Sequence, residues 1–271
     1  MSTGHWAELA SRWDAIGEPL RPSASDIEAV TTLARSLPAG RRRCLVLGAT
    51  SELRTAAWPE GTELLALDRS RSMVEALWET GEPGIPAAVL GDWRSLPLSP
   101  ACVDLAVCDG GWHLLDRLRD QPTLAGELAR VVRPGGRVAV RVFVPSSVAP
   151  DPDDVLGLLR SGRVTDANHL KVLLWSAVRR PDGTVAVADV WAALIGASPD
   201  LDALAADLGW PGPTLHAFGA YRGSADRYHL VDEGEVIDQL VGTGAFSLAS
   251  VHEGAQLPPD LRFPTIVVER T

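Results

Sequence analysis

Gly48 and Asp68 are the residues whose types and spacing point most directly to a binding chemistry. Gly48 follows the apolar run Cys44-Leu45-Val46-Leu47, and Asp68 ends a second apolar run 20 residues later. A glycine after a buried strand lets the backbone approach a ligand, and an acid at the end of the next strand can accept hydrogen bonds from a ribose diol. The pair therefore predicts a nucleotide-binding strand–helix–strand unit over residues 43–68.

His113 is the candidate for proton transfer. It lies four residues beyond Asp109, which ends the apolar run 103–108. Ligands of parallel sheets bind outside the carboxyl ends of the strands, and an imidazole there can take a proton from a hydroxyl, a phenol or an amine near neutral pH. Two interpretations stay open: His113 is a general base, or it caps or packs against the following helix.

These residues come together only if the strands that precede them are parallel neighbours. Apolar runs typical of strands occupy residues 44–47, 64–67, 87–90, 103–108 and 137–144, and helical segments occupy residues 26–37, 70–80 and 123–132. Strands that alternate with helices predict an α/β fold with a doubly wound, mostly parallel sheet covered on both faces. Two final runs, 245–252 and 263–270, suit an antiparallel pair at the sheet edge, which completes seven strands.

The segment between the fifth and sixth strands differs from the rest. We expect a helical substrate lid over residues 151–244, inserted in a core of residues 41–150 and 245–271, with N-terminal helices over residues 1–40. The helices expected in the insertion cover residues 152–161, 165–179, 187–196, 200–208 and 233–242. Trp6 and Trp13, on the first N-terminal helix, are expected to close the other side of the pocket.

Composition limits the function classes. The 271 residues are 46% hydrophobic and carry a formal charge of -10, which disfavours binding to nucleic-acid phosphates. No run reaches the roughly 20 apolar residues of a membrane span and none is typical of a signal peptide, so we expect a soluble, cytoplasmic protein. The three cysteines have no zinc-site spacing, so no metal is expected.

Four segments together resemble the class I S-adenosylmethionine-dependent methyltransferases. They are VLGATSEL (46–53), LLALDRSRSMV (64–74), VLGDWRSLPL (89–98), and VDLAVCDGGWHLL (103–115) with LARVVRPGGRVAV (128–140). The likeness covers about residues 24–145 and the terminal strand pair. It implies a Rossmann-like fold, S-adenosyl-L-methionine as cofactor, S-adenosyl-L-homocysteine as product, and methyl transfer to an oxygen or nitrogen of a small, partly apolar acceptor in specialised metabolism. A homodimer or a partner subunit stays open, and neither nucleic acid nor membrane is expected as a partner.

The resemblance also assigns residues. It implies that the methionine portion of the cofactor lies against Gly48, Ala49, Thr50, Asp109 and Gly110. The ribose would bind Asp68, and the cofactor carboxylate would bind Arg21. The adenine would lie among Arg69, Met73, Gly91, Asp92 and Trp93. Asp68 can instead cap a helix, Trp93 can be a core aromatic, and Arg21 can be a surface residue. For the acceptor it implies a pocket wall at Trp112 and a pocket rim at Tyr221, Tyr228 and His229, with His113 beside the sulfonium.

One departure from the family keeps two other functions open. The family's first motif has an acid followed by glycines at three alternate positions. In this chain the four positions hold Val46, Gly48, Thr50 and Glu52, so one of the three glycines is present. The chain could therefore be a catalytically silent methyltransferase-like subunit. A nicotinamide-dependent oxidoreductase is disfavoured, because its fingerprint needs glycines where Thr50 and Leu53 stand.

Overall fold

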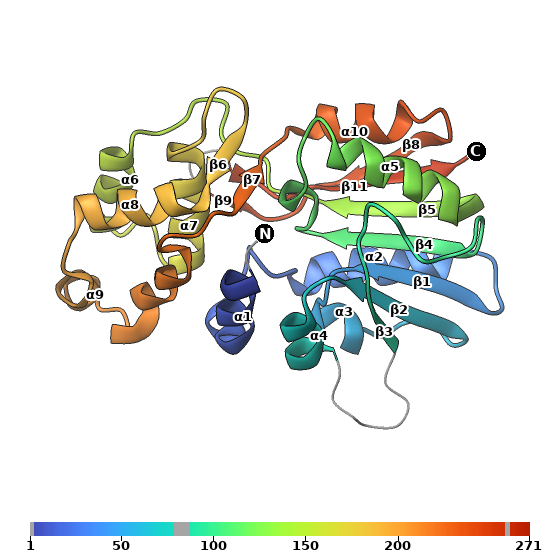
Figure 1. The fold of residues 1–271 in the computed structure, drawn as a ribbon, viewed down its shortest axis with the longest axis horizontal. Coiled ribbons are helices and arrows are strands. Elements are labelled where there is room, and N and C mark those ends of the chain that lie inside the picture. Colours follow the sequence, from blue (N-terminus) through green and yellow to red (C-terminus); the bar gives the residue numbers. More distant parts are fainter. Residues whose placement is uncertain (1–2, 79–86, 258–260) are drawn as a thin grey trace.

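A seven-stranded sheet forms the centre of the computed structural model, which describes residues 3–78, 87–257 and 261–271 (Figure 1). The strand order is β3-β2-β1-β4-β5-β11-β8. The strands are β1 (Arg42–Leu47), β2 (Thr62–Asp68), β3 (Ala87–Leu90), β4 (Val103–Asp109), β5 (Val132–Arg141), β8 (Phe246–His252) and β11 (Thr265–Arg270). The first five strands pair in parallel, and β11 runs antiparallel between β5 and β8. The predicted sheet, with its terminal antiparallel pair, is confirmed.

Helices cover both faces because successive side chains of a strand point to opposite sides. Leu45 and Leu47 of β1 face one core, packed by α5 (Asp120–Val131) and α10 (Glu233–Val241). Cys44 and Val46 face the other core, packed by α2 (Ala24–Ser36), α3 (Ser51–Thr55) and α4 (Arg71–Leu77). The continuous apolar run over residues 44–47 of β1 follows from this double burial.

The insertion between β5 and β8 lies beside the carboxyl ends of β4 and β5. The arrowheads of these two strands point toward the insertion (Figure 1). It contains α6 (Pro152–Arg160), α7 (Ala167–Ala177), α8 (Val187–Ala197), α9 (Leu201–Leu208), the 3₁₀ segment η3 (Gly212–Tyr221) and a two-stranded sheet of β6 (Thr184–Ala186) and β7 (Arg227–His229). The sequence did not predict this small sheet. A short pair, β9 (Gln256–Leu257) with β10 (Leu261–Arg262), precedes β11.

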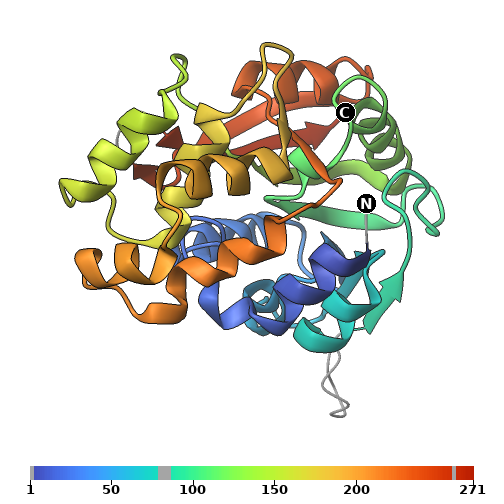
Figure 2. The ribbon, with the colours of Figure 1, turned by 60° about the vertical axis from the view of Figure 1, so that its left-hand side comes forward.

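One element differs in placement from the expected division of the chain. α10, which we assigned to the insertion, packs against α5, β8 and β11 of the core. The N-terminal helix α1 (Thr3–Ser11), followed by η1 (Trp13–Ala15), contacts α4 of the core and η3 of the insertion. In Figures 1 and 2 α1 therefore lies where the core and the insertion face each other.

The short helix η2 (Trp112–Leu114) follows β4 and carries His113 between the sheet and the insertion. No helix in the described ranges is both long enough and apolar enough to cross a membrane.

Candidate active site

A cavity lies between the carboxyl ends of the strands, the insertion and α1. It encloses about 950 Å³ not filled by atoms, open solvent at its mouth included. The core contributes Gly48, Ala49, Thr50, Asp68, Met73, Trp93, Asp109, Gly110, His113 and Arg141 to its wall. The insertion contributes Lys171, Trp175, Tyr221 and Tyr228, and the N-terminal segment contributes Trp6 and Trp13.

The first loop is shaped by Gly48. Its φ of +105° is accessible to glycine and strained for other residues, so the chain turns sharply at the end of β1. A Cβ at this position would meet the ring of Trp93 at 3.6 Å and the Asp68 carboxylate at 4.0 Å. One glycine is thus enough to make the turn and keep the backbone open to the cavity.

Asp68 lies at the centre of the site. Its carboxylate accepts hydrogen bonds from the backbone N–H of Ala49 at 3.1 Å and of Ser70 at 2.7 Å. Burial raises the pKa of Asp68, and these two hydrogen bonds oppose that shift. Each carboxylate oxygen has a second acceptor position, so the side chain can hold these two N–H groups and still bind a diol. The alternative prediction, that Asp68 caps the helix, is wrong, because Ser70 is the N-cap of α4 and its hydroxyl accepts from the Met73 N–H.

A second, smaller cavity adjoins the first. It encloses about 470 Å³ and shares Trp6, Asp68, Trp93 and Leu114 with the larger one. Its remaining wall is made of Arg69, Ser70, Asp92 and Leu115. A nucleoside needs adjacent spaces for its base and its substituents, with an acid at the ribose between them, and these two cavities fit that requirement.

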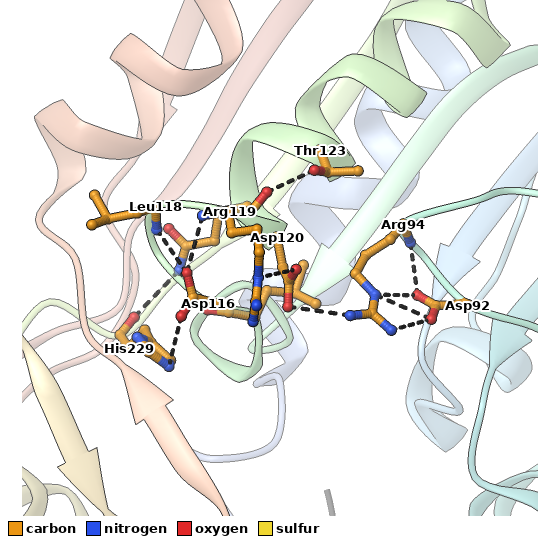
Figure 3. A network of polar contacts seen from close by, with 10 residues as sticks. Asp92, Arg94, Asp116, Leu118, Arg119, Asp120, Thr123 and His229 are labelled. Atoms are coloured by element: carbon orange, nitrogen blue, oxygen red, sulfur yellow. Dashed lines mark hydrogen bonds and ion pairs between the residues drawn. The ribbon is translucent and has the colours of Figure 1, made fainter.

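Asp92, at the end of β3, faces the smaller cavity but is already engaged. Arg94 donates to both of its oxygens, at 2.9, 3.1 and 2.5 Å, and also reaches Asp120 at 3.4 Å (Figure 3). The Arg94 hydrogen bonds hold the pKa of Asp92 at about 2. Gly91 lies outside both cavities: a Cβ there would meet Leu67 at 3.3 Å, so this glycine permits packing on β2.

Trp93 forms the floor shared by the two cavities. Its indole N–H donates to the carbonyl of Leu67 at 2.7 Å. Its ring lies so close to Gly111 that a Cβ on Gly111 would be 2.7 Å from it. Trp93 is therefore fixed across the ends of β2 and β4, where it can contact a base.

Asp109 forms a buried ion pair with Arg141 below the cavity. The guanidinium Nε of Arg141 lies 2.5 Å from the carboxylate, and the two side chains are 5% and 8% exposed. Arg141 also donates to the carbonyl of Pro19 at 3.0 Å, which ties the N-terminal segment to β5. Gly110 follows with a φ of +62° and turns the chain toward His113.

His113 is buried in the cavity wall. Its ring centroid lies 5.7 Å from that of Trp175 and 5.4 Å from that of Tyr228. Burial, with a smaller contribution from the charge of Arg141, lowers the pKa of His113 to about 4. Nδ1 is buried without a hydrogen-bond partner. The unprotonated nitrogen of a neutral imidazole can accept a hydrogen bond from a hydroxyl or an amine.

Several predicted residues lie elsewhere. Arg21 forms an ion pair with Glu52 and stacks over Trp13 at 5.6 Å, outside the cavity wall. Glu52, which stands at a glycine position of the family motif, is the carboxylate that Arg21 contacts in this structure, and the role of Arg21 at the cofactor carboxylate stays a prediction. Trp112 is fully buried in the core, where its indole donates to Gln239 at 3.0 Å, so the predicted pocket wall at this position is wrong.

The three residues predicted to form the pocket rim lie in two different places. Tyr221 and Tyr228 line the larger cavity, but they are only 3% and 4% exposed and so belong to its inner wall. The imidazole of His229 lies 4.0 Å from the Asp116 carboxylate (Figure 3), and His229 is not part of the wall of either cavity. It faces Asp116 because β7 pairs with β6 in the small sheet that was not predicted.

Two charged residues of the wall were missed. Arg141 is 5% exposed and ends β5, where the sequence shows only an apolar run interrupted by arginines. Lys171 is 1% exposed and lies within the apolar stretch 170–175 of α7. A single lysine inside an otherwise apolar helix was a signal that could have identified it.

Comparison with known proteins is consistent with this geometry. Residues 45–140 match the family model described as a methyltransferase domain. An uncharacterised methyltransferase of Mycobacterium tuberculosis strain H37Rv is 36% identical over 107 residues, which cover 38% of this chain and 41% of that protein. The match thus spans about two fifths of the length of such relatives.

Solved structures show the same fold over a longer span. A Rhodobacter sphaeroides protein named as a zinc-dependent alcohol dehydrogenase has a TM-score of 0.65 at 17% identity and covers 100% of both chains. The 1,6-didemethyltoxoflavin N1-methyltransferase of Burkholderia thailandensis, solved with 1,6-didemethyltoxoflavin and S-adenosylhomocysteine, has a TM-score of 0.51 at 13% identity and covers 98% of this chain and 89% of that one. Both similarities concern the fold alone.

Proposed function

The chain belongs to the class I S-adenosylmethionine-dependent methyltransferases, and we propose that it transfers a methyl group to an oxygen or nitrogen atom of a small, partly apolar molecule. The observation that carries the proposal is the adjoining pair of cavities with Asp68 in the wall of both. The cofactor, when bound, supplies an already activated methyl group. The chain's own residues must then bind, orient and exclude water.

Binding of the cofactor is assigned to the core side of the cavities. Asp68 accepts from the ribose hydroxyls, while Gly48, Ala49 and Thr50 line the larger cavity on the methionine side. Arg69 and Trp93 border the smaller cavity, where the adenine fits. Asp92 keeps Arg94 as its partner, so its contribution there is an acceptor atom shared with that arginine.

Orientation of the acceptor is assigned to His113 and the aromatic wall. Because the imidazole is neutral at physiological pH and lies in the cavity wall, its unprotonated nitrogen can accept a hydrogen bond from the acceptor's hydroxyl or amine and receive its proton during methyl transfer. The low pKa of His113 makes it a weak base, which suits an acceptor that loses its proton only in the transition state. Trp175, Phe143 and Tyr228 form a tight ring cluster that keeps water out.

The proposal is tested by titrating the purified protein with S-adenosylmethionine, S-adenosylhomocysteine, NADH and NADPH in parallel by calorimetry. We expect the first two to bind in the micromolar range and the nicotinamides not to bind. Binding of a nicotinamide alone would overturn the proposal. Acceptor candidates are then screened for S-adenosylhomocysteine formation.

A catalytically silent subunit is the second candidate. The observation that favours it is the Arg21–Glu52 ion pair, which engages a residue of α3 at a position where the family's first motif has glycine. Tight cofactor binding with no turnover on phenols, hydroxy acids or amines would favour this function over the first.

A further inference from the structure

The insertion side of the larger cavity carries one positive charge, that of Lys171. This is the single lysine of a sequence with two dozen arginines. It lies on α7, which is buried on all sides from Ala167 to Ser176. The side chain is 1% exposed and lines the cavity, and its ammonium lies 5.4 Å from the centre of the Phe218 ring.

The Lys171 ammonium has no anionic partner among the described residues. Asp166 is the one acid whose charge acts on it, but the Asp166 carboxylate already accepts from the N–H groups of Asn168 and His169 at the start of α7. A buried ammonium that is neither paired nor hydrogen-bonded is costly, and the contact with the Phe218 ring offsets only part of that cost. Such a charge is therefore expected to serve a ligand.

The acids of the cavity wall lie on the opposite, core side. The Asp68 carboxylate accepts hydrogen bonds from two backbone N–H groups, and the Asp109 carboxylate forms an ion pair with Arg141. The insertion side presents Lys171, Trp175, Tyr221 and Tyr228 and contributes no carboxylate to the wall in the described ranges. The two sides thus differ in charge: the acids face the predicted cofactor, and the cation faces the space left for the acceptor.

Lys171 and His113 both lie near Trp175, and all three residues line the larger cavity. Trp175 lies one turn further along α7, on the same side of the helix, and a turn rises by about 5.4 Å. The Trp175 ring in turn contacts His113 at 5.7 Å. An acceptor can therefore present a hydroxyl or an amine to His113 and a second group to Lys171, with an apolar part along Trp175.

We propose that the acceptor is an anionic molecule, and that Lys171 binds its carboxylate or phosphate while His113 faces the atom to be methylated. This assignment of a substrate class rests on the proposed function. The lowered pKa of Lys171, about 8 because of burial, leaves the ammonium charged at neutral pH and ready to form such a pair.

The test uses the one-lysine sequence. Protein labelled with 13C at the lysine Cε gives one side-chain signal, and its pH titration reports Lys171 directly. The complex with S-adenosylhomocysteine is titrated with benzoate, with its uncharged analogue benzamide and with inorganic phosphate. We expect benzoate or phosphate to shift the Lys171 signal and raise its titration midpoint, with benzamide binding at least tenfold more weakly. Benzoate alone would identify a carboxylate site, and phosphate alone a phosphate site.

Variants separate this proposal from its premise. Lys171→Met should abolish the preference for benzoate over benzamide, Lys171→Arg should retain part of it, and Arg227→Met, at an exposed cation of β7, should leave it unchanged. Affinity for S-adenosylhomocysteine should stay within twofold in all three. Equal binding of benzoate and benzamide to the wild type, or an unchanged preference in Lys171→Met, would overturn the proposal.

Two further outcomes are distinct. If Lys171→Met lost affinity for S-adenosylhomocysteine instead, the lysine would belong to the cofactor site and the proposal would be wrong. If the wild type did not bind S-adenosylhomocysteine, the proposed function itself would fail, whatever the anions did.

Discussion

The Asp109 carboxylate and the Arg141 guanidinium lie 2.5 Å apart at the carboxyl ends of two adjacent parallel strands, and both line the cavity. Arg141 thereby carries the hydrogen bond to Pro19 that joins the N-terminal segment to the sheet. A single buried pair thus supports the floor of the site and positions the segment that closes it.

Arg141→Ala should lower the free energy of unfolding by roughly 3–5 kcal/mol, because it leaves the Asp109 charge buried and unpaired. Denaturant unfolding at pH 7 measures this. The matched control is Arg41→Ala, which removes an exposed pair with Glu63 and should cost about 1 kcal/mol or less. A second variant, Asp109→Asn with Arg141→Gln, should recover part of the loss; equal effects of Arg141→Ala and Arg41→Ala would contradict this account.

Asp68→Asn should weaken binding of S-adenosylhomocysteine by roughly 1–3 kcal/mol, because an amide replaces one of the acceptor oxygens that a ribose diol needs. Calorimetry gives the dissociation constant directly. Asp92→Asn is the comparison, and it should have the smaller effect because Arg94 already holds that carboxylate. An unchanged constant in Asp68→Asn would remove Asp68 from the cofactor site.

Gly111→Ala should destabilise the fold by roughly 1–3 kcal/mol, because the added methyl group would sit 2.7 Å from the Trp93 ring, which its hydrogen bond to Leu67 holds in place. Pairing it with Trp93→Phe should restore most of the stability. Gly126→Ala, on an exposed face of α5 with open space around it, should instead stabilise by about 0.5–1 kcal/mol. If the double variant is no more stable than Gly111→Ala, the contact with Trp93 is not the cause of the lost stability.

The buried neutral His113 should make the fold sensitive to acid. The pKa of His113 is about 4 in the folded protein and near 6.5 in the unfolded protein. Between these values the unfolded state binds a proton that the folded state does not bind. Stability is therefore lost as the pH falls from 6.5 to 4, by roughly 3 kcal/mol for this residue. Unfolding free energies of wild type and His113→Phe, measured across this range, should diverge in that direction. A constant difference between the two would show that His113 is not buried in its neutral form.

Lys171→Met should stabilise the protein at pH 7, on the order of 1–3 kcal/mol, because it removes the cost of a buried unpaired ammonium. The folded-state pKa of about 8 lies below the unfolded value of 10.5, so between them the unfolded state holds a proton that the folded state has lost. Wild-type stability then rises with pH through this window, and the advantage of Lys171→Met shrinks. A variant that is less stable than wild type at pH 7 would mean that Lys171 has a structural partner.

The sequence by itself determined the sheet and the residues that local spacing controls. A strand, a glycine turn and an acid at the end of the next strand are short-range features, so their spacing alone assigns Gly48 and Asp68 to one loop cluster. The parallel order of the first five strands follows from their alternation with helices, and His113 was placed at the carboxyl end of β4 for the same reason.

The tertiary structure decided which side chains meet across long separations. Arg21 turns to Glu52, Trp112 to Gln239 and His229 to Asp116, because a polar side chain takes the nearest partner that the packing offers, and that partner lies 31, 127 or 113 residues away. Asp109 finds Arg141 only once β4 and β5 pair, and Lys171 reaches the cavity only once α7 packs against the core. Charge and burial at these positions depend on packing between distant segments, which spacing along the chain does not encode.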